Sequence, residues 1–361
     1  MKTIVLVGGG HSHLYCLLNA VNRSNNLNII LISPSVYQYY SGMFSGFAEG
    51  IYQLNDIRIN LEKLCQKASI TFIQSKVNKI NPMENKVYCE SGQAFEYDVI
   101  SFDIGSMIKP IEQAGQNQTI KPNYRFVEQI LNFRNGQKPV IIGGGASGVE
   151  LALSVLAWRK HRFENPEVTI VSRSPILSSF HRNVQRSIIQ IVKHKGLKIV
   201  ENEDVVKINK EFVLTSNEQK IPYTNLLTLT GPKADVIFRQ SDLPTDQEGF
   251  LMVNNKLQCI NHPNIFGAGD CIHFSSNGLP KNGVYAVRQG PILWKNIMRY
   301  LNEKDLYPFK PQKRYISILS TGNKEGLFTY DSFYYYGKMA WKLKNFIDTR
   351  FIQKFNHLNE K

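Results

Sequence analysis

Long apolar segments are missing from this sequence. Among its 361 residues there is no uncharged apolar run of about 18 residues, the length that a membrane-spanning helix requires. The apolar stretch near the N-terminus, Ile4–Val7, is short and leads directly into glycines, so we interpret it as a first strand and not as a signal peptide. These absences argue against an integral membrane protein, and we expect a cytoplasmic location.

Cysteine is scarce, and its spacing carries no motif. The chain has 5 cysteines, and no two of them are spaced as CxxC or CxxxxC. The sequence therefore predicts neither a zinc site nor a local redox disulfide, and we expect no metal centre. Reduced, structural thiols are the natural interpretation for a cytoplasmic protein. The cysteines are Cys16, Cys65, Cys89, Cys259 and Cys271.

Negative charge is under-represented, since the formal net charge is +14 at pH 7. An excess of this size favours an acidic partner, and nucleic acid, anionic lipid and the phosphates of dinucleotides all qualify. The sequence contains no helix-turn-helix, zinc-finger or RNA-binding signature. We therefore predict no nucleic-acid partner.

An internal repeat is the most informative feature that is present. Residues 4–10 read IVLVGGG and residues 139–145 read PVIIGGG. A helix-like segment and a second apolar strand, at 27–32 and 168–171, follow each of them. Strand, glycine turn, helix and strand in this order form the βαβ unit that binds dinucleotides. Two such units predict an α/β protein with two Rossmann-like domains.

Other segments fill the space between and after these units. Apolar patterns predict strands at 70–74, 86–90 and 98–102, and helical spacing predicts a helix over 284–301. A short strand within 264–270 ends at an aspartate.

The first glycine turn departs from the usual GxGxxG pattern. Its glycines allow a backbone approach to a pyrophosphate at the helix N-terminus, where free N–H groups favour negative charge. His13 replaces the third glycine, which predicts looser packing of the helix on the strand. His11 and His13 are candidates for contact with phosphate or flavin, with a structural role as the alternative. Ser33 stands where a ribose-binding acid is usual. The candidate ligands are Gly8, Gly9, Gly10, His11, Ser12, His13 and Ser33.

The second turn is complete, because Gly143, Gly145 and Gly148 form GxGxxG. The ribose-reading position after the second strand holds Ser172 and then Arg173. A hydroxyl and a guanidinium suit the 2′-phosphate of NADPH, whereas a carboxylate would favour NADH. We therefore expect NADPH to be preferred, with an arginine that simply faces solvent as the alternative.

A third turn follows the short strand near residue 265. Gly269 and Asp270 end this strand, and an aspartate there can accept hydrogen bonds from a polyol such as the ribitol of FAD. In a chain with two dinucleotide units, this turn indicates a flavin site.

Longer segments carry a family resemblance. They are YSGMFSG at 40–46, YDVISFDIGS at 97–106, PKNGVYAVRQG at 280–290 and the tail pattern from 341 to 355. Together with GGGHSH at 8–13, they make the chain similar to the flavoproteins with two dinucleotide-binding domains, which include the disulfide reductases and type II NADH dehydrogenases. Within this family the chain most resembles the flavoprotein domain associated with selenide-water dikinase.

The resemblance implies an order of parts and several roles. The FAD domain comprises 1–110 and 236–305, the NAD(P) domain is inserted as 111–235, and a small C-terminal module occupies 306–361. Gly105 belongs to the second FAD-contacting turn, and Asp270 binds the ribitol. Two catalytic candidates follow: Glu150 beside the nicotinamide and flavin, with a structural carboxylate as the alternative, and Lys281 near the reduced flavin.

Departures from the family are equally informative. The disulfide reductases carry a cysteine pair on the first helix, where this sequence has only Cys16. Type II NADH dehydrogenases carry two glutamines where Val284 and Arg288 stand here. Dithiol chemistry is therefore not expected, and the electron acceptor must reach the flavin directly.

The tail predicts an amphipathic helix over about 338–355. Apolar residues and basic residues share it, so it suits a membrane interface with anionic lipid, and the protein would then be peripheral on the inner face of the membrane. Packing on its own domain or on a second subunit, as in a homodimer, is the alternative. The apolar set is Met339, Leu343, Phe346, Ile347, Phe351 and Phe355, and the basic set is Lys342, Lys344, Arg350 and Lys354.

These observations predict an FAD-dependent NAD(P)H oxidoreductase. It takes a hydride from NAD(P)H and passes electrons to a quinone-like acceptor without using a redox disulfide. One alternative is a flavoenzyme with a soluble acceptor linked to selenium or sulfur metabolism. An alternative of another class is a flavin-bearing nucleotide sensor with little turnover.

Overall fold

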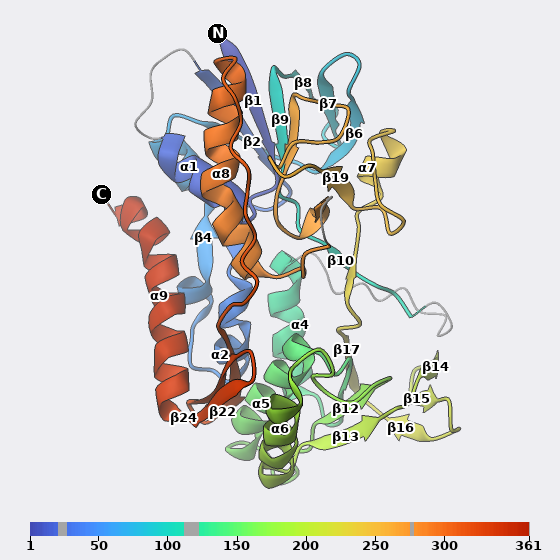
Figure 1. Ribbon diagram of the computed structural model, residues 1–361. Helices are drawn as coiled ribbons and strands as arrows, with labels where there is room; N and C mark the ends of the chain where they lie inside the picture. Colours follow the sequence, from blue (N-terminus) through green and yellow to red (C-terminus); the bar gives the residue numbers. More distant parts are fainter. Residues whose placement is uncertain (21–26, 112–122, 275–277, 361) are drawn as a thin grey trace.

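The computed structural model describes residues 1–20, 27–111, 123–274 and 278–360. Figure 1 shows two α/β parts, with the N-terminal sheet at one end of the molecule and the second sheet at the other. The start of the expected inserted domain, at 112–122, lies outside the described residues.

The first sheet has five parallel strands in the order β20-β9-β1-β2-β5. Its central strand is buried on both sides, as is usual for a parallel sheet that helices cover, and Ile4–Val7 are at most 4% exposed. The edge strand β20 comes from late in the chain and pairs with β9, so the chain returns to this sheet after the second unit. The strands are β1 Lys2–Val7, β2 Leu27–Ser33, β5 Thr71–Gln74, β9 Val99–Phe102 and β20 Ile265–Gly267.

Two helices pack together beside this sheet, α1 (His11–Ala20) and α8 (Gly283–Leu301). Gly290 makes their close approach possible, because a Cβ at this position would lie 2.8 Å from the Cβ of Tyr15. The expected helix over 284–301 is confirmed, and it is held directly against the helix of the first glycine turn.

The second sheet has four parallel strands in the order β13-β12-β11-β17. Both glycine turns thus follow the first strand of a parallel sheet, and the prediction of two Rossmann-like units is confirmed. The strands are β11 Pro139–Ile142, β12 Thr169–Ser172, β13 Lys198–Glu201 and β17 Asn225–Thr228, and the helices are α4 Asn123–Asn135, α5 Ala146–Lys160 and α6 Arg182–Lys195.

Two short strands, β10 (Met107–Ile108) and β18 (Pro232–Lys233), pair antiparallel where the chain passes between the two sheets. An antiparallel three-stranded sheet accompanies each parallel sheet. These are β6 Val77–Asn81, β7 Lys86–Cys89 and β8 Ala94–Glu96, and β14 Val205–Ile208, β15 Phe212–Thr215 and β16 Lys220–Pro222. The shorter elements are β3 Tyr37–Tyr39, β4 Arg58–Asn60, β19 Leu251–Val253, β21 Ile272–Phe274, α2 Phe44–Ala48, α3 Leu61–Lys67 and α7 Ile237–Gln240, with the 3-10 turns η1 Ser41–Met43, η2 Leu54–Ile57 and η4 Gly269–Cys271.

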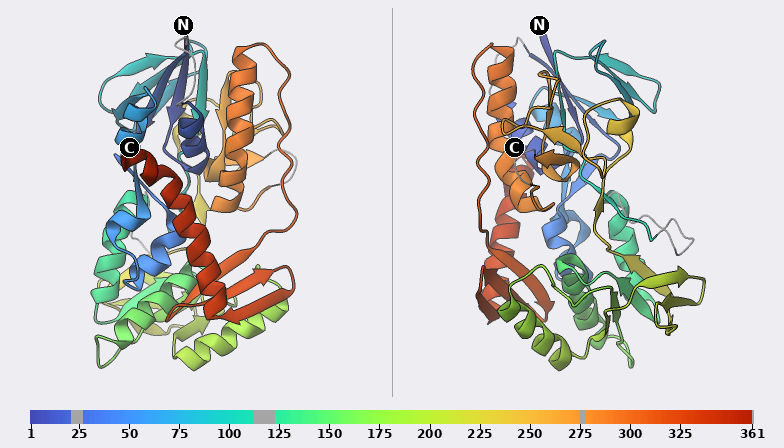
Figure 2. Two further views of the ribbon diagram at one scale, coloured as in Figure 1. Left: turned by 90° about the vertical axis from the view of Figure 1, so that its left-hand side faces the viewer. Right: turned by 45° about the vertical axis from the view of Figure 1, so that its right-hand side comes forward.

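The C-terminal part is an antiparallel sheet followed by a long helix. Its helix α9 lies along the side of the molecule and reaches from the second part toward α1 (Figure 2). β22 packs on α5, and α9 packs on β4 and α3. Gly322 permits the first of these contacts, because a Cβ there would lie 2.6 Å from the Cβ of Ala157. The elements are β22 Ser317–Gly322, β23 Glu325–Tyr330, β24 Phe333–Gly337 and α9 Lys338–Glu360.

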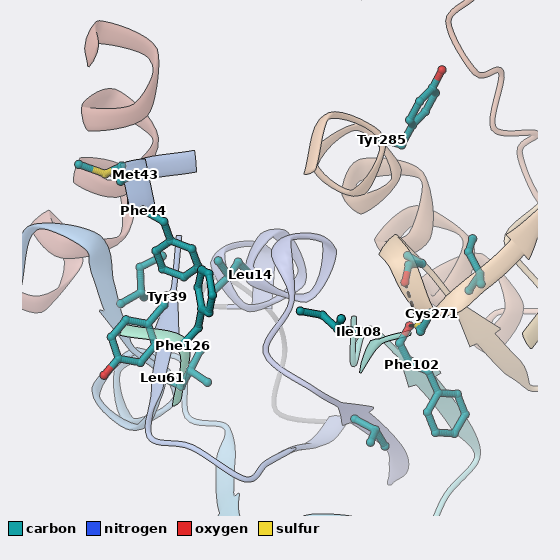
Figure 3. Close-up of a cluster of buried hydrophobic side chains, with 14 of the residues drawn as sticks. Leu14, Tyr39, Met43, Phe44, Leu61, Phe102, Ile108, Phe126, Cys271 and Tyr285 are labelled. Atoms are coloured by element: carbon teal, nitrogen blue, oxygen red, sulfur yellow. Dashed lines mark hydrogen bonds between the residues drawn. The ribbon is translucent and has the colours of Figure 1, made fainter. Parts of the chain in front are cut away.

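One hydrophobic core connects these parts. Figure 3 shows Phe44 of α2 next to Phe126 of α4, and their ring centroids are 5.3 Å apart. Leu14 of α1 and Leu61 of α3 belong to the same buried cluster as Phe126. This shared core fixes the first glycine turn relative to the second unit.

Candidate functional site

The first glycine turn is closed against the end of β9. Gly8 has a φ of +90°, and a Cβ there would lie 2.4 Å from the backbone oxygen of Asp103. A Cβ at Gly9 would lie 2.5 Å from the Leu61 side chain, and one at Gly10 would lie 2.2 Å from the Asp103 carboxyl group. Gly8 therefore has room only for glycine, and a side chain at Gly9 or Gly10 would have to displace Leu61 or the Asp103 carboxyl group.

Asp103 is the residue that sequence reasoning missed at this turn. Its Oδ2 accepts hydrogen bonds from the backbone N–H groups of Ser12 at 2.7 Å and His13 at 3.2 Å. Burial raises the pKa of Asp103 to about 7, although these two amides oppose the shift, and nearby Asp270 adds to it. The sequence feature that could have identified Asp103 is its position directly after a buried parallel strand, where ligand-binding side chains are often found.

His13 is fully buried between α1 and the first sheet. Its Nδ1 lies 2.6 Å from the Gly8 oxygen, and its Nε2 lies 2.8 Å from the Ser101 hydroxyl. Burial lowers the pKa of His13 to about 4, so the ring is neutral near pH 7. His13 stands at the third glycine position of the usual GxGxxG turn. Its imidazole ring is packed between helix and sheet, and both ring nitrogens have a hydrogen-bonding partner.

His11 and Ser12 face other elements. The His11 ring lies 5.5 Å from Tyr40 and 5.5 Å from Phe351 of α9, between centroids. Ser12 donates a hydrogen bond from Oγ to the Ala286 oxygen of α8 at 2.6 Å. At the end of β2, Ser33 donates to the oxygen of Ser35 at 3.0 Å.

The second glycine turn has open space beside Gly145, whereas Asp103 and Leu61 lie against the glycines of the first turn. Gly148 packs so closely that a Cβ would lie 2.0 Å from the Gly143 oxygen. Gly145 caps α5 without a side-chain hydrogen bond, and nothing lies within 4 Å of a Cβ placed there. The first amides of α5 therefore face open space, as a pyrophosphate site requires. Gly105, with φ +70°, is similarly open.

The ribose-reading end of the second unit holds three polar side chains. Ser172 donates a hydrogen bond to the Ser174 oxygen at 2.6 Å. The Arg173 side chain is 82% exposed, and its Nε lies 3.7 Å from Asp204. Glu201, at the end of β13, accepts from the Ile176 N–H at 2.6 Å, and sequence reasoning did not include this carboxylate.

A small pocket surrounds the third turn. Gly269 donates its backbone N–H to Oε1 of Gln289 at 2.7 Å. Lys281 donates to the Ile272 oxygen, and its ammonium lies 3.9 Å from the centroid of Phe250. Burial lowers the pKa of Lys281. The pocket is lined by Gly269, Asp270, Ile272, Phe274, Leu279, Pro280, Lys281, Asn282, Tyr285 and Gln289.

Glu150 lies where the two units and the C-terminal part meet. Its Oε1 accepts hydrogen bonds from the Ser45 hydroxyl at 3.0 Å and from the Ser320 N–H at 2.9 Å. The ammonium of Lys344, on α9, lies 3.8 Å from the same oxygen. Three elements far apart in the sequence thus hold one carboxylate.

A second carboxylate completes this buried group. Asp348 accepts a hydrogen bond from Lys344 at 2.7 Å and one from the Tyr40 hydroxyl at 3.1 Å. Burial opposes the charge of Lys344, but Glu150 and Asp348 outweigh it and raise the pKa of the ammonium. Sequence reasoning missed Tyr40, Ser45 and Asp348.

The structure corrects the expectation of which side chains on the tail helix are exposed and which are packed. Lys344 was expected among the surface lysines, but its side chain is 12% exposed and paired with acids. Phe355 was expected on the free apolar face and is 3% exposed, because α9 packs through this side. Among the described side chains, the large apolar residues that remain exposed on α9 are Met339, Leu343, Phe346 and Ile347, and those on β24 are Phe333, Tyr334 and Tyr335.

The cysteines are all free and buried. Figure 3 shows Cys271 beside the end of β9, and burial raises the pKa of this thiol to about 12. Within the described ranges, no group of three or more His, Cys, Asp or Glu side chains is arranged to hold a metal ion. In the same part of the chain, no helix is long and apolar enough to cross a membrane.

Two glycine turns on separate parallel sheets, joined by a shared core, define an oxidoreductase that works with two dinucleotides. A family model, pyridine nucleotide-disulphide oxidoreductase, matches residues 2–290. The chain belongs to the pyridine nucleotide-disulphide oxidoreductase family. The resemblance to the flavoproteins with two dinucleotide-binding domains is thereby confirmed, and the chain is a flavoprotein oxidoreductase that uses FAD and a nicotinamide dinucleotide.

Several known proteins are similar over most of the chain. A probable NADH dehydrogenase of Dictyostelium discoideum is 24% identical, over 92% of this chain and 81% of its own. A type II NADH:quinone oxidoreductase of Staphylococcus aureus is 23% identical, over 98% of this chain and 96% of its own. Among solved structures, the sulfide:quinone oxidoreductase of Aquifex aeolicus has a TM-score of 0.81 at 22% identity, covering 99% of this chain and 92% of that one.

Proposed function

We propose that this protein oxidises NADH or NADPH by hydride transfer to FAD and passes the electrons to a quinone-like acceptor. FAD is held by the first and third turns and the dinucleotide substrate by the second. The observation that carries this proposal is the position of Glu150: α5 begins at the open turn of the second unit and brings this carboxylate against Ser45 of the first part. A dinucleotide that lies along α5 would thus extend toward the first part.

The residues at the second and third turns, and at the end of β9, fit these cofactors. Gly145 leaves the α5 amides open to a pyrophosphate, and Gly105 leaves space beside the end of β9. The third turn presents Asp270 in a small pocket, where a ribitol chain needs a hydrogen-bond acceptor. When bound, the flavin accepts the hydride and releases electrons to the acceptor, and the protein supplies orientation and electrostatics.

The cysteines and the Glu150–Lys344 pair bear on how electrons pass from the flavin to the acceptor. The thiols are buried and their pKa values are raised, for example to about 12 at Cys65, so they are poor nucleophiles and a dithiol relay is not supported. Glu150 and Lys344 form a half-buried pair beside the proposed nicotinamide position. Their role would be to orient the reactants and hold a proton near them.

The exposed apolar face of α9 supports a quinone as the acceptor. Leu343, Phe346 and Ile347 are 40%, 57% and 45% exposed, and Lys342 and Arg350 are exposed on the same helix. Such a helix suits the boundary between headgroups and acyl chains of an anionic membrane, where quinones are dissolved. Relatives named NADH:quinone oxidoreductase support the same acceptor class.

A panel of acceptors tests this proposal. The purified, FAD-loaded protein is given NADH or NADPH together with short-chain quinones, ferricyanide, oxygen, or selenium and sulfur compounds. We expect the quinones to have the highest kcat/KM among the physiological acceptors. A soluble selenium or sulfur acceptor with a higher kcat/KM would contradict the quinone assignment.

A further inference from the structure

Asp103 occupies the space between the first and third glycine turns. A Cβ at Gly10 would lie 2.2 Å from its carboxyl carbon, and one at Gly269 would lie 2.4 Å from its Oδ1. The residue is 4% exposed. One buried carboxyl group thus separates the two turns that FAD must bridge.

Two hydrogen bonds to Oδ2 fix the orientation of the Asp103 carboxyl group. Oδ2 accepts the amides of Ser12 and His13 at the N-terminus of α1, while Oδ1 faces Gly269. In a Rossmann unit, a dinucleotide pyrophosphate binds beside these first helical amides. An ionised Asp103 would place a negative charge against the two negative charges of that pyrophosphate.

Among the residues that the structure describes, the groups near Asp103 do not neutralise its charge. From α1 the titratable neighbours are His13, whose backbone N–H binds Asp103 and whose ring burial keeps neutral near pH 7, and the Cys16 thiol, whose pKa burial raises. From η4 they are Asp270, which adds negative charge, and the buried Cys271 thiol. On the α8 side, the Lys281 ammonium is engaged with the Ile272 oxygen and the Phe250 ring.

We propose that Asp103 is the residue that couples FAD binding to proton uptake: the cofactor binds to the chain whose Asp103 is a neutral acid. In this form Oδ2 still accepts the two amides, and a proton on Oδ1 removes the negative charge that would otherwise lie against the pyrophosphate. The inference rests on the proposed placement of FAD at the first turn and adds the protonation state in which that turn accepts it.

The sign of the pH dependence follows from linkage. The pKa of Asp103 in the FAD-free protein is raised to about 7. The negative charge of a bound pyrophosphate would raise this pKa further. FAD affinity should therefore be constant below this pKa and fall by up to about tenfold per pH unit above it. The same linkage requires about one proton to be taken up per FAD bound at pH 8, and almost none at pH 6.

FAD binding to the stripped protein tests this, with flavin fluorescence quenching as the readout between pH 6 and 9. Asp103→Asn keeps an amide oxygen for Ser12 and His13 but cannot ionise, so its affinity should be independent of pH and exceed that of the wild type at pH 8. Asp98→Asn is the matched control, because Asp98 pairs with Lys2 on the surface before the same strand, and it should keep the wild-type slope.

Calorimetry in buffers of different ionisation enthalpy measures the proton directly on the wild-type protein, so the test does not depend on the folding of a variant. A wild-type affinity without slope, a slope that persists in Asp103→Asn, or no proton uptake at pH 8 would overturn the inference while leaving the proposed function standing. Failure of FAD to bind at any pH would overturn both.

Discussion

The Lys344 ammonium of α9 lies 3.8 Å from the Glu150 carboxylate of α5. Glu150 comes from the helix of the second glycine turn, whereas Lys344 comes from the last helix of the chain. Asp348 and the backbone oxygen of Gly42 bind the same ammonium. The C-terminal part is therefore a component of the proposed site and links the helix of the second glycine turn to the first part.

Removing Lys344 should destabilise the protein strongly. Lys344→Ala would leave the half-buried Glu150 and the buried Asp348 without their cation, and breaking a buried pair typically costs up to about 3–5 kcal/mol. Urea unfolding measures the free energy of unfolding. Lys342→Ala, on the exposed side of the same helix, should change it by less than about 0.5 kcal/mol. Equal effects of the two substitutions would contradict the buried network.

Replacing Asp270 should weaken FAD retention. Asp270→Ala removes a charged acceptor from the proposed ribitol site, and such hydrogen bonds contribute about 1.5–3 kcal/mol. The purified protein should be yellow, and the variant should lose flavin during extensive dialysis. Asp98→Asn serves again as the control. Retention of flavin by Asp270→Ala as tight as in the wild type would show that Asp270 does not bind FAD.

Arg173 should determine a preference for NADPH. Arg173→Glu replaces an attractive contact with the 2′-phosphate by a repulsive one, so the apparent NADPH affinity should fall at least about tenfold, with a smaller change for NADH. Stopped-flow flavin reduction with each nucleotide measures this. Arg314→Glu is a matched control, since Arg314 is also exposed and paired with an aspartate. The same response to both nucleotides would place Arg173 outside the nucleotide site.

The exposed face of α9 should bind anionic vesicles. Burial of Phe346 and Ile347 in the membrane and attraction of the lysines to lipid would act together, and the electrostatic contribution should weaken as the Debye length falls from about 10 Å at 0.1 M salt to about 3 Å at 1 M. Phe346→Ser with Ile347→Ser should abolish co-sedimentation at low salt. Met83→Ser, which changes another exposed apolar residue, should not.

This double substitution is a cleaner test than removal of the helix, because truncation would also remove the buried Asp348 and Phe355. Absence of wild-type binding to anionic vesicles at low salt would contradict the membrane contact and favour a soluble acceptor.

Local sequence pattern was sufficient for most of the fold. The runs before Gly8 and Gly143 are β-branched and apolar because parallel strands are buried on both faces. Gly8 and Gly143 themselves begin tight turns in which a Cβ would clash with backbone. Local pattern could not identify Glu150, because its partners come from residues 45, 320 and 344, which are distant in sequence. Only the family resemblance pointed to it.

The rest of the site depends on contacts that spacing does not encode. Lys344 and Asp348 stand four residues apart, which is the spacing of an ordinary surface ion pair on a helix. Only the packing of α9 against β4 and α3 shows that this pair is buried. Asp103 is similar: its position after β9 was visible in the sequence, but its capping of α1 depends on the pairing of β1 with β9.

Anaerobic double-mixing stopped flow tests the central claim most directly. The FAD-loaded protein is mixed first with NADH or NADPH and then with a short-chain quinone, while the flavin absorbance is followed. We predict prompt bleaching in the first step and recovery of the oxidised absorbance in the second, both faster than steady-state turnover. A flavin that stays oxidised with both nucleotides, or that is reduced and then ignores the quinone, would contradict the account.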